Sequence, residues 1–158
     1  GLEFNPEIPV GMMVESPAAA VLTDRFVDDV DFISIGTNDL VQYALAVDRT
    51  NTSVASLYQA TDPAVLRLID MSLKAAKAGG VSASLCGQMS AEPAYVPLLL
   101  GLGLRELSVP SSIIPELKHV CRSITVAQCE QIAQRAMSLD SAREIDTYLR
   151  EEFQKLRA

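Results

Sequence analysis

Two carboxylates, an amide, a guanidinium and a thiol stand at positions in the sequence where they could do chemistry together. Glu15 and Asp39 could share a hard divalent ion such as Mg²⁺, which takes one or two carboxylates and completes its shell with water and substrate phosphate. Asn38 offers an amide donor beside Asp39, and Arg49 offers a bidentate clamp for phosphate or carboxylate. Cys86 is followed by a glycine, which leaves room for the close approach of a substrate. From their types and spacing alone, these residues predict an anion or metal site.

Each of these residues also has a purely structural interpretation. An aspartate at the end of a strand, such as Asp39, often only caps a helix, and Glu15 can simply favour a following helix N-terminus. An arginine in the position of Arg49 is more often an ordinary surface residue. A cysteine after an apolar segment, such as Cys86, is most often an inert buried thiol. The chemical hypothesis therefore depends on whether the fold brings these residues together.

Short apolar segments alternate with longer helical patterns along the first two thirds of the chain. The predicted strands are 10–14, 32–35, 81–85 and 106–109, and the predicted helices are 18–27, 64–78, 93–100 and 113–122. Alternating strands and helices indicate a parallel α/β sheet, and near-continuous apolar strands indicate a sheet buried on both faces. The carboxyl ends of parallel strands meet at one edge, where such folds place their active sites. We therefore expect Glu15, Asn38, Asp39 and Cys86 to lie at a common edge of the sheet.

After residue 110 the sequence shows helical patterns only. Capping-box spacings that begin at Thr125 and Ser141 predict two further helices. The basic side chains of this tail include Arg135, Arg143, Arg150 and Lys155, which we interpret as lying on solvated helix faces that cover the sheet. The predicted organisation is a partial (βα) barrel over 5–124 and a helical tail over 125–158, while residues 1–4 are compatible with an expression scar.

Composition and charge exclude several classes of function. Lys and Arg number 13 and Asp and Glu number 20, which gives a net charge of −7 in 158 residues. Without a basic run, neither nucleic acid nor an anionic membrane is an expected partner. The longest apolar run, 96–102, contains a proline and a glycine and is too short to span a bilayer. The first nine residues lack the order of a secretory signal, so we expect a cytoplasmic location.

Cysteine and histidine counts narrow the chemistry further. Cys86, Cys121 and Cys129 are odd in number and show no CxxC spacing, which argues against a disulfide scaffold or a zinc site. His119 is the only histidine, so a Ser-His-Asp or Cys-His mechanism would have to use it, and multi-histidine metal sites are excluded. We expect Cys86 to be the most reactive thiol, because the other two fall in helical segments that are expected to pack.

Taken together, the segments around these residues resemble one family. Residues 11–19 (GMMVESPAA) resemble G-x-M-x-E-x-P-x-A, and residues 34–43 (SIGTNDLVQY) followed by Asp48-Arg49 resemble S-I-G-T-N-D-L-x-Q-Y with a later D-R. Residues 85–89 (LCGQM) resemble the C-G-E-M cysteine loop, and residues 97–103 (PLLLGLG) resemble the next helix. These are features of the phosphoenolpyruvate-binding domain of Enzyme I of the bacterial sugar phosphotransferase system, also found in multiphosphoryl transfer proteins. The resemblance runs from about residue 9 to 115 and is weaker beyond.

The resemblance implies a role for each candidate residue. The family's matching carboxylates bind Mg²⁺, which assigns Glu15 and Asp39 to the metal. The residues that match Asn38 and Arg49 hold phosphoenolpyruvate, and the cysteine that matches Cys86 handles the proton at the enolpyruvate carbon. In the family, the phosphoryl group passes to a histidine on a separate swivelling domain and then to a phosphocarrier protein. The resemblance thus implies a transferase in which the metal and the donors neutralise charge on the transferred group.

Two departures from the family pattern limit this expectation. Gln88 stands where the family usually has glutamate, so a carboxylate that could tune Cys86 is missing here. The family domain resembles a TIM barrel, which typically has about 250 residues and eight strands, whereas this chain shows four candidate strands that match the last four. We therefore expect the C-terminal half of a phosphoenolpyruvate-binding TIM barrel, which is not expected to complete the reaction alone.

Two other functions remain open from the sequence. A phosphoenolpyruvate synthase or pyruvate phosphate dikinase relative shares residues 36–39, although residues 42–43 and 88–89 favour Enzyme I. A non-catalytic dimerisation module would need only the half barrel. Because four strands leave two open edges and an uncovered face, we expect a homodimer or larger oligomer, or a tail from Thr125 onward that folds across the open face.

Overall fold

A four-stranded parallel sheet forms the centre of the molecule in the computed structural model, which describes residues 1–157. The strands are β1 (Gly11–Val14), β2 (Phe32–Gly36), β3 (Ser82–Cys86) and β4 (Glu106–Leu107). They lie in the order β1-β2-β3-β4, and every neighbouring pair is parallel. The predicted parallel α/β fold is confirmed, although β4 is only two residues long, half of its predicted length.

The strand register brings the candidate residues to one edge. Val14 pairs with Ile35, and Gly36 pairs with Cys86, so β1, β2 and β3 end at nearly the same level. The residues that follow these strands therefore emerge side by side at the carboxyl edge of the sheet. This arrangement is the one expected from the sequence.

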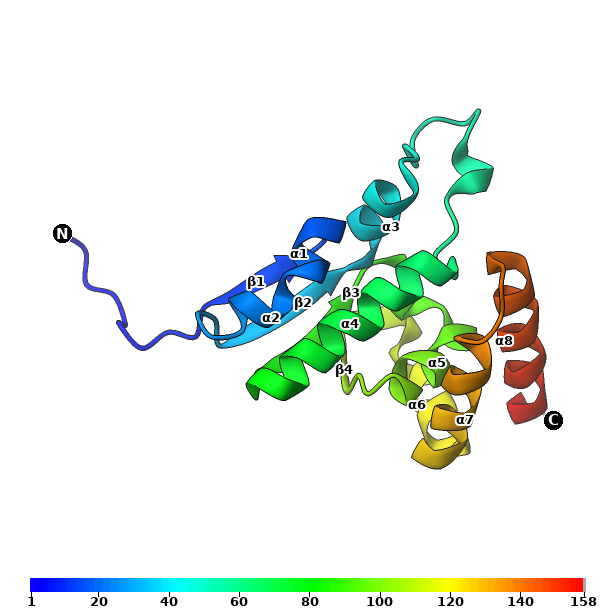
Figure 1. Ribbon diagram of the computed structural model, residues 1–158. Coiled ribbons are helices and arrows are strands. Elements are labelled where there is room, and N and C mark those ends of the chain that lie inside the picture. Colours follow the sequence, from blue (N-terminus) through cyan, green and yellow to red (C-terminus); the bar gives the residue numbers. More distant parts are fainter. Residues whose placement is uncertain (158) are drawn as a thin grey trace.

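Helices α1 (Pro17–Val21), α2 (Thr23–Phe26) and α4 (Pro63–Gly79) cover one face of the sheet (Figure 1). The single helix predicted over 18–27 is two short helices that meet at Leu22. The Thr23 hydroxyl lies 2.9 Å from the Ala19 carbonyl and 3.1 Å from the Ala20 carbonyl, and a hydroxyl that bonds to the preceding turn favours such a bend. Helix α4 begins at the Asp62 cap and is followed by Gly80, whose φ is 73°.

Helix α3 (Thr37–Leu45) was not predicted, because its polar first turn looked like a loop in the sequence. Gly36 at its N-cap supplies no capping side chain, so the usual sequence signal for a helix start is missing. The helix is held by Leu40 and Val41, which are fully or almost fully buried. A long connection with the short 3₁₀ turn η1 (Ala55–Leu57) then leads to α4.

The remaining elements follow β3 and are all helical except β4. They are η2 (Gln88–Ala91), η3 (Pro93–Tyr95), α5 (Val96–Gly101), η4 (Ser111–Ile113), α6 (Ile114–Ser123), α7 (Val126–Ala136) and α8 (Ala142–Arg157). The capping box at Thr125 is confirmed, with Gln128 as its partner. The Ser141 hydroxyl accepts the Glu144 N–H at 3.3 Å, as the second capping-box spacing predicted.

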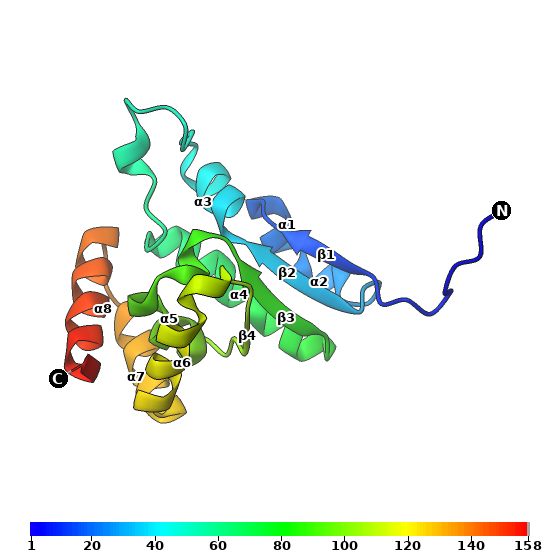
Figure 2. The same ribbon diagram turned by 180° about the vertical axis from the view of Figure 1, so that it is seen from behind.

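The C-terminal helices are part of the main core and do not fold across the open face of the sheet, so that expectation was wrong. Helices α5 and α7 are in direct backbone contact, which the lack of a side chain at Gly101 permits. A Cβ at this position would lie only 2.1 Å from the Cys129 carbonyl oxygen. Ile132 of α7 and Ile145 and Leu149 of α8 belong to the same hydrophobic cluster as the sheet residues. The tail therefore packs beside α5, as Figure 2 shows.

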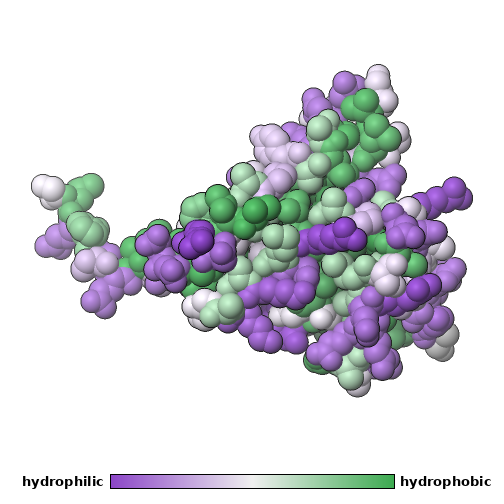
Figure 3. Space-filling model, viewed as in Figure 1, coloured by the Kyte–Doolittle hydropathy of each residue, from purple (hydrophilic) through white to green (hydrophobic). Residues whose placement is uncertain are grey.

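The sheet face opposite α4 is left open by the described part of the chain (Figure 2). Met13 of β1 is 43% exposed and Phe32 of β2 is 38% exposed, although both lie in a central sheet. Apolar surface also occurs over α1 and over the connection after α3, where Val21 and Leu57 are exposed (Figure 3). The molecule thus presents apolar surface on more than one side.

Candidate functional site

Glu15 follows β1 directly and lies over the end of β2. A Cβ at Gly36 would come within 2.9 Å of the Glu15 Oε2 atom. Gly36 therefore leaves the space that the Glu15 side chain occupies. Since Gly36 immediately precedes α3, this carboxylate lies near the helix turn that carries Asp39.

Asn38 and Asp39 lie in the first turn of α3, and Asn38 is fixed by two hydrogen bonds. Its side-chain Oδ1 accepts the backbone N–H of Gln88 at 2.9 Å, and its carbonyl accepts the Tyr58 hydroxyl at 2.9 Å. Because Oδ1 is used in this way, the Nδ2 group of Asn38 is the part left to donate to a ligand.

Cys86 is the last residue of β3, and its thiol is half-buried. The hydroxyl of Ser34 lies 3.9 Å from the Cys86 sulfur, and the hydroxyl of Ser84 donates to Ser34 at 3.1 Å. The Thr37 hydroxyl donates to the Cys86 carbonyl at 2.7 Å. The cysteine is therefore tied to both β2 and the start of α3.

Gly87 has a conformation that suits only glycine. Its φ is 104°, and a Cβ at this position would lie 2.4 Å from the Thr37 hydroxyl and 2.9 Å from Asn38 Oδ1. The close approach lets the cysteine loop touch the first turn of α3. The glycine after Cys86 is thus needed for packing between two loops of the site.

Arg49 lies in the connection after α3, where its backbone N–H donates to Gln42 Oε1 at 3.3 Å. Burial raises the pKa of the Tyr58 phenol, and the positive charge of Arg49 opposes this rise. The negative charge of Asp39 adds to the rise. Tyr58 therefore lies close enough to both Arg49 and Asp39 for their charges to act on its phenol.

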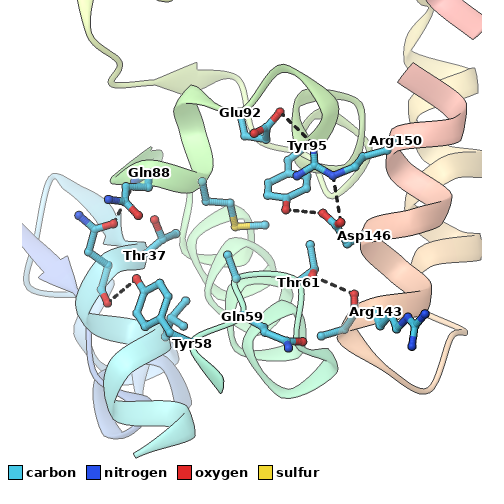
Figure 4. A pocket seen from close by; sticks show the side chains of 15 residues that line it. Thr37, Tyr58, Gln59, Thr61, Gln88, Glu92, Tyr95, Arg143, Asp146 and Arg150 are labelled. Atoms are coloured by element: carbon cyan, nitrogen blue, oxygen red, sulfur yellow. Dashed lines mark hydrogen bonds and ion pairs between the residues drawn. The ribbon is translucent and has the colours of Figure 1, made fainter. Parts of the chain in front are cut away.

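A cavity of about 530 Å³ lies beside these residues, between α3, η2 and α8 (Figure 4). Asn38 and Gln88 belong to its wall, as do Tyr58, Tyr95 and Arg150. Of the five predicted site residues, only Asn38 lines it in the described part of the chain. The cavity thus adjoins the strand-end site rather than containing it.

The wall of this cavity includes side chains that sequence reasoning missed. Tyr95 donates a hydrogen bond of 2.6 Å to Asp146, and Arg150 donates one of 2.9 Å to the same carboxylate. Tyr95 and Asp146 are 51 residues apart in the sequence. No local pattern in the sequence signals such a pair.

The cysteines differ from the expectation in one respect. Cys121 is exposed rather than packed, because it lies on the outer side of α6. Cys129 of α7 is buried as expected, and burial raises the pKa of its thiol. The prediction that Cys121 is shielded was therefore wrong.

Two further observations concern metals and membranes. Within residues 1–157, no three His, Cys, Asp or Glu side chains form a metal-binding group, so a metal here would depend on the two carboxylates Glu15 and Asp39. Two carboxylates fit Mg²⁺, which obtains its other ligands from water and substrate phosphate. No helix in the same part of the chain is both long and apolar enough to cross a bilayer.

The fold and the site define a parallel α/β domain whose polar residues gather where consecutive strands end. A family model described as "PEP-utilising enzyme, PEP-binding domain" matches residues 1–126. The chain belongs to this family of phosphoenolpyruvate-binding domains.

Curated relatives extend the match beyond the family model. A protein of Priestia megaterium is 42% identical over 97% of this chain, one of Mycoplasma pneumoniae is 38% identical over 96%, and one of Enterococcus faecalis is 44% identical over 87%. Each is named phosphoenolpyruvate-protein phosphotransferase. The chain spans only about a quarter of their length, with 27%, 26% and 24% of each covered.

Proposed function

We propose that this chain is part of a cytoplasmic phosphoenolpyruvate–protein phosphotransferase and contributes half of its substrate site. The observation that carries the proposal is the common position of Glu15, Asn38, Asp39 and Cys86 at the ends of three neighbouring parallel strands. The similarity to relatives with this name supports the same reaction. In such an enzyme, the phosphoryl group passes by way of a protein histidine to a phosphocarrier protein that serves sugar uptake.

The proposed division of labour follows from the chemistry of each side chain. Glu15 and Asp39 hold Mg²⁺, which when bound neutralises charge on the phosphoryl group. Arg49 binds the phosphate or carboxylate of phosphoenolpyruvate, and Asn38 Nδ2 donates to the substrate. Cys86 gives a proton to the enolpyruvate carbon as the P–O bond breaks, which produces pyruvate. Positioning supplies much of the rate in such a transfer.

Calorimetry with Mg²⁺ and phosphoenolpyruvate tests the proposed site. We expect weak binding of phosphoenolpyruvate that requires Mg²⁺, because this half of the site lacks the rest of its ligands. Asp39→Asn should weaken binding by about tenfold or more, since it removes one of two metal carboxylates. The matched control is Asp24→Asn on α2, whose carboxylate is exposed and distant from the strand ends. Equal binding by all three proteins would reject the site and leave the dimerisation module as the better assignment.

We further propose that the four strands are the C-terminal half of a (βα)₈ barrel and that the isolated chain forms a homodimer. The support is the open sheet face, where Met13 and Phe32 are exposed, together with the unpaired outer edges of β1 and β4. Light scattering at micromolar concentration should give about twice the 17.0 kDa mass of the chain. A monomer at all concentrations would reject the dimer but would not bear on the proposed substrate site.

A further inference from the structure

The C-terminal helix α8 lies beside residues 92–95, the segment that follows the cysteine loop (Figure 4). A hydrogen-bond network that includes charged side chains joins the helix to this segment. The Tyr95 hydroxyl donates to Asp146 Oδ1 at 2.6 Å, and Arg150 Nε donates to Asp146 Oδ2 at 2.9 Å. Both oxygens of this carboxylate are therefore occupied, one by each neighbour. Hydrogen bonds to an ionised acceptor are about twice as strong as neutral ones.

Arg150 extends the network to the start of the same segment. Its Nη1 lies 3.8 Å from Glu92 Oε1, and its guanidinium carbon lies 5.8 Å from the centre of the Tyr95 ring. Arg150 thus contacts residues on both sides of Pro93. The helix holds the segment at two points rather than one.

The charge states of the network favour this arrangement. Burial raises the pKa of the Tyr95 phenol, and its hydrogen bond to Asp146 raises it further, so the phenol keeps its proton and remains a donor. Burial alone would raise the pKa of the Asp146 carboxyl, but the hydrogen bonds from Arg150 and Tyr95 outweigh it and the net shift is downward. The carboxylate is therefore ionised at neutral pH.

Between this network and Cys86 the chain is tightly fixed. The fully buried Ser90 hydroxyl lies 2.7 Å from the Gly87 carbonyl and 2.8 Å from the Ser108 carbonyl, and it shares its proton between them. The Gln88 N–H is bonded to Asn38 Oδ1. Tyr95 and Cys86 are thus joined by a short stretch of chain that is hydrogen-bonded at Gln88 and Ser90.

We propose that Tyr95, Asp146 and Arg150 are positioning residues through which helix α8 holds the Cys86 loop against the first turn of α3. The role of this loop in proton transfer rests on the proposed function, whereas its positioning by α8 does not. Loss of the network removes the anchor at the C-terminal end of residues 87–92, while the bonds of Gln88 and Ser90 remain, so this segment becomes more mobile and the Cys86 thiol more accessible. The C-terminal helix thereby controls the geometry of a site to which it contributes no strand-end residue.

Thiol alkylation with mass-spectrometric mapping tests this proposal on the chain itself. Tyr95→Phe keeps the ring and removes the hydroxyl, and Asp146→Asn removes the charge. We expect each variant to alkylate Cys86 about three- to tenfold faster, while the rate at exposed Cys121 of the same molecule stays constant. The matched control is Glu152→Gln, which breaks the Lys155–Glu152 ion pair on α8 without touching the loop.

Hydrogen exchange separates a local effect on the cysteine loop from a general destabilisation of the fold. Amides of residues 87–92 should exchange about tenfold faster in Tyr95→Phe, with the amides of α4 unchanged. If Cys86 reacts at the parental rate, or if Cys86 and Cys121 accelerate together, α8 does not position the loop. None of these readouts uses phosphoenolpyruvate or Mg²⁺. The positioning of the loop by α8 is therefore tested independently of the proposed function.

Discussion

Asn38 Oδ1 accepts the backbone N–H of Gln88 at 2.9 Å, which joins the first turn of α3 to the cysteine loop across 50 residues of sequence. One amide side chain thus serves two purposes in the proposed site. Its oxygen holds the loop, and its nitrogen is left to donate to the proposed substrate. A substitution at this position affects loop geometry and ligand binding through different atoms.

Asn38→Ala leaves the Gln88 N–H without its acceptor, so we expect a loss of about 1 kcal/mol in the free energy of unfolding. Asn38→Asp keeps an oxygen at the same position and should retain most of that stability. Urea unfolding of both variants measures the difference. Equal losses would mean that the hydrogen bond adds little.

Gly87→Ala should destabilise the fold more than Gly103→Ala, although both glycines have a φ of 104°. A Cβ at Gly103 meets nothing within 4 Å, so this variant reports the backbone strain alone, about 1–2 kcal/mol. At Gly87 the contact with Thr37 adds an overpacking cost of about 1–3 kcal/mol. The denaturant midpoints of the two variants measure this difference. Similar losses of stability in both would show that the cysteine loop shifts away from Thr37 at little cost.

The three thiols should alkylate in the order Cys121, Cys86, Cys129. Cys121 is exposed, Cys86 is half-buried, and burial both shields Cys129 and raises the pKa of its thiol. Partial labelling at neutral pH followed by peptide mapping gives the order. Labelling of Cys129 before Cys86 would contradict the packing of α7 against α5.

Acid should weaken the attachment of α8. The pKa of Asp146 lies below its ordinary value of 3.8 in the folded protein, so its contribution to stability is present above that pH and is lost as pH falls through the folded pKa. The effect at neutral pH is at most about 1 kcal/mol, because the carboxylate is 35% exposed. The gap in unfolding free energy between the parent and Asp146→Asn should therefore shrink in acid. A gap that stays constant with pH would rule out the carboxylate as its source.

Much of the fold could be predicted because its signals are local. Apolar runs revealed the strands, and Thr125 with Gln128 revealed the start of α7. Helix α3 was missed because Gly36 gives no capping signal and the polar turn 37–39 resembles a loop. The Tyr95–Asp146 bond was missed because it joins distant elements, and each of its partners looks like an ordinary surface residue in the sequence.

The contact between Gly101 and the Cys129 carbonyl bears on where this protein can be cut for expression or fusion. The family match ends at residue 126, at the first residue of α7, which would make that point look like a natural boundary. A truncation there would strip α7 from α5 and expose the backbone of α5 at Gly101, against which the Cys129 carbonyl packs. A practical design keeps α7 and α8 and places any added tag at the extended N-terminal segment, which projects away from the sheet (Figure 1).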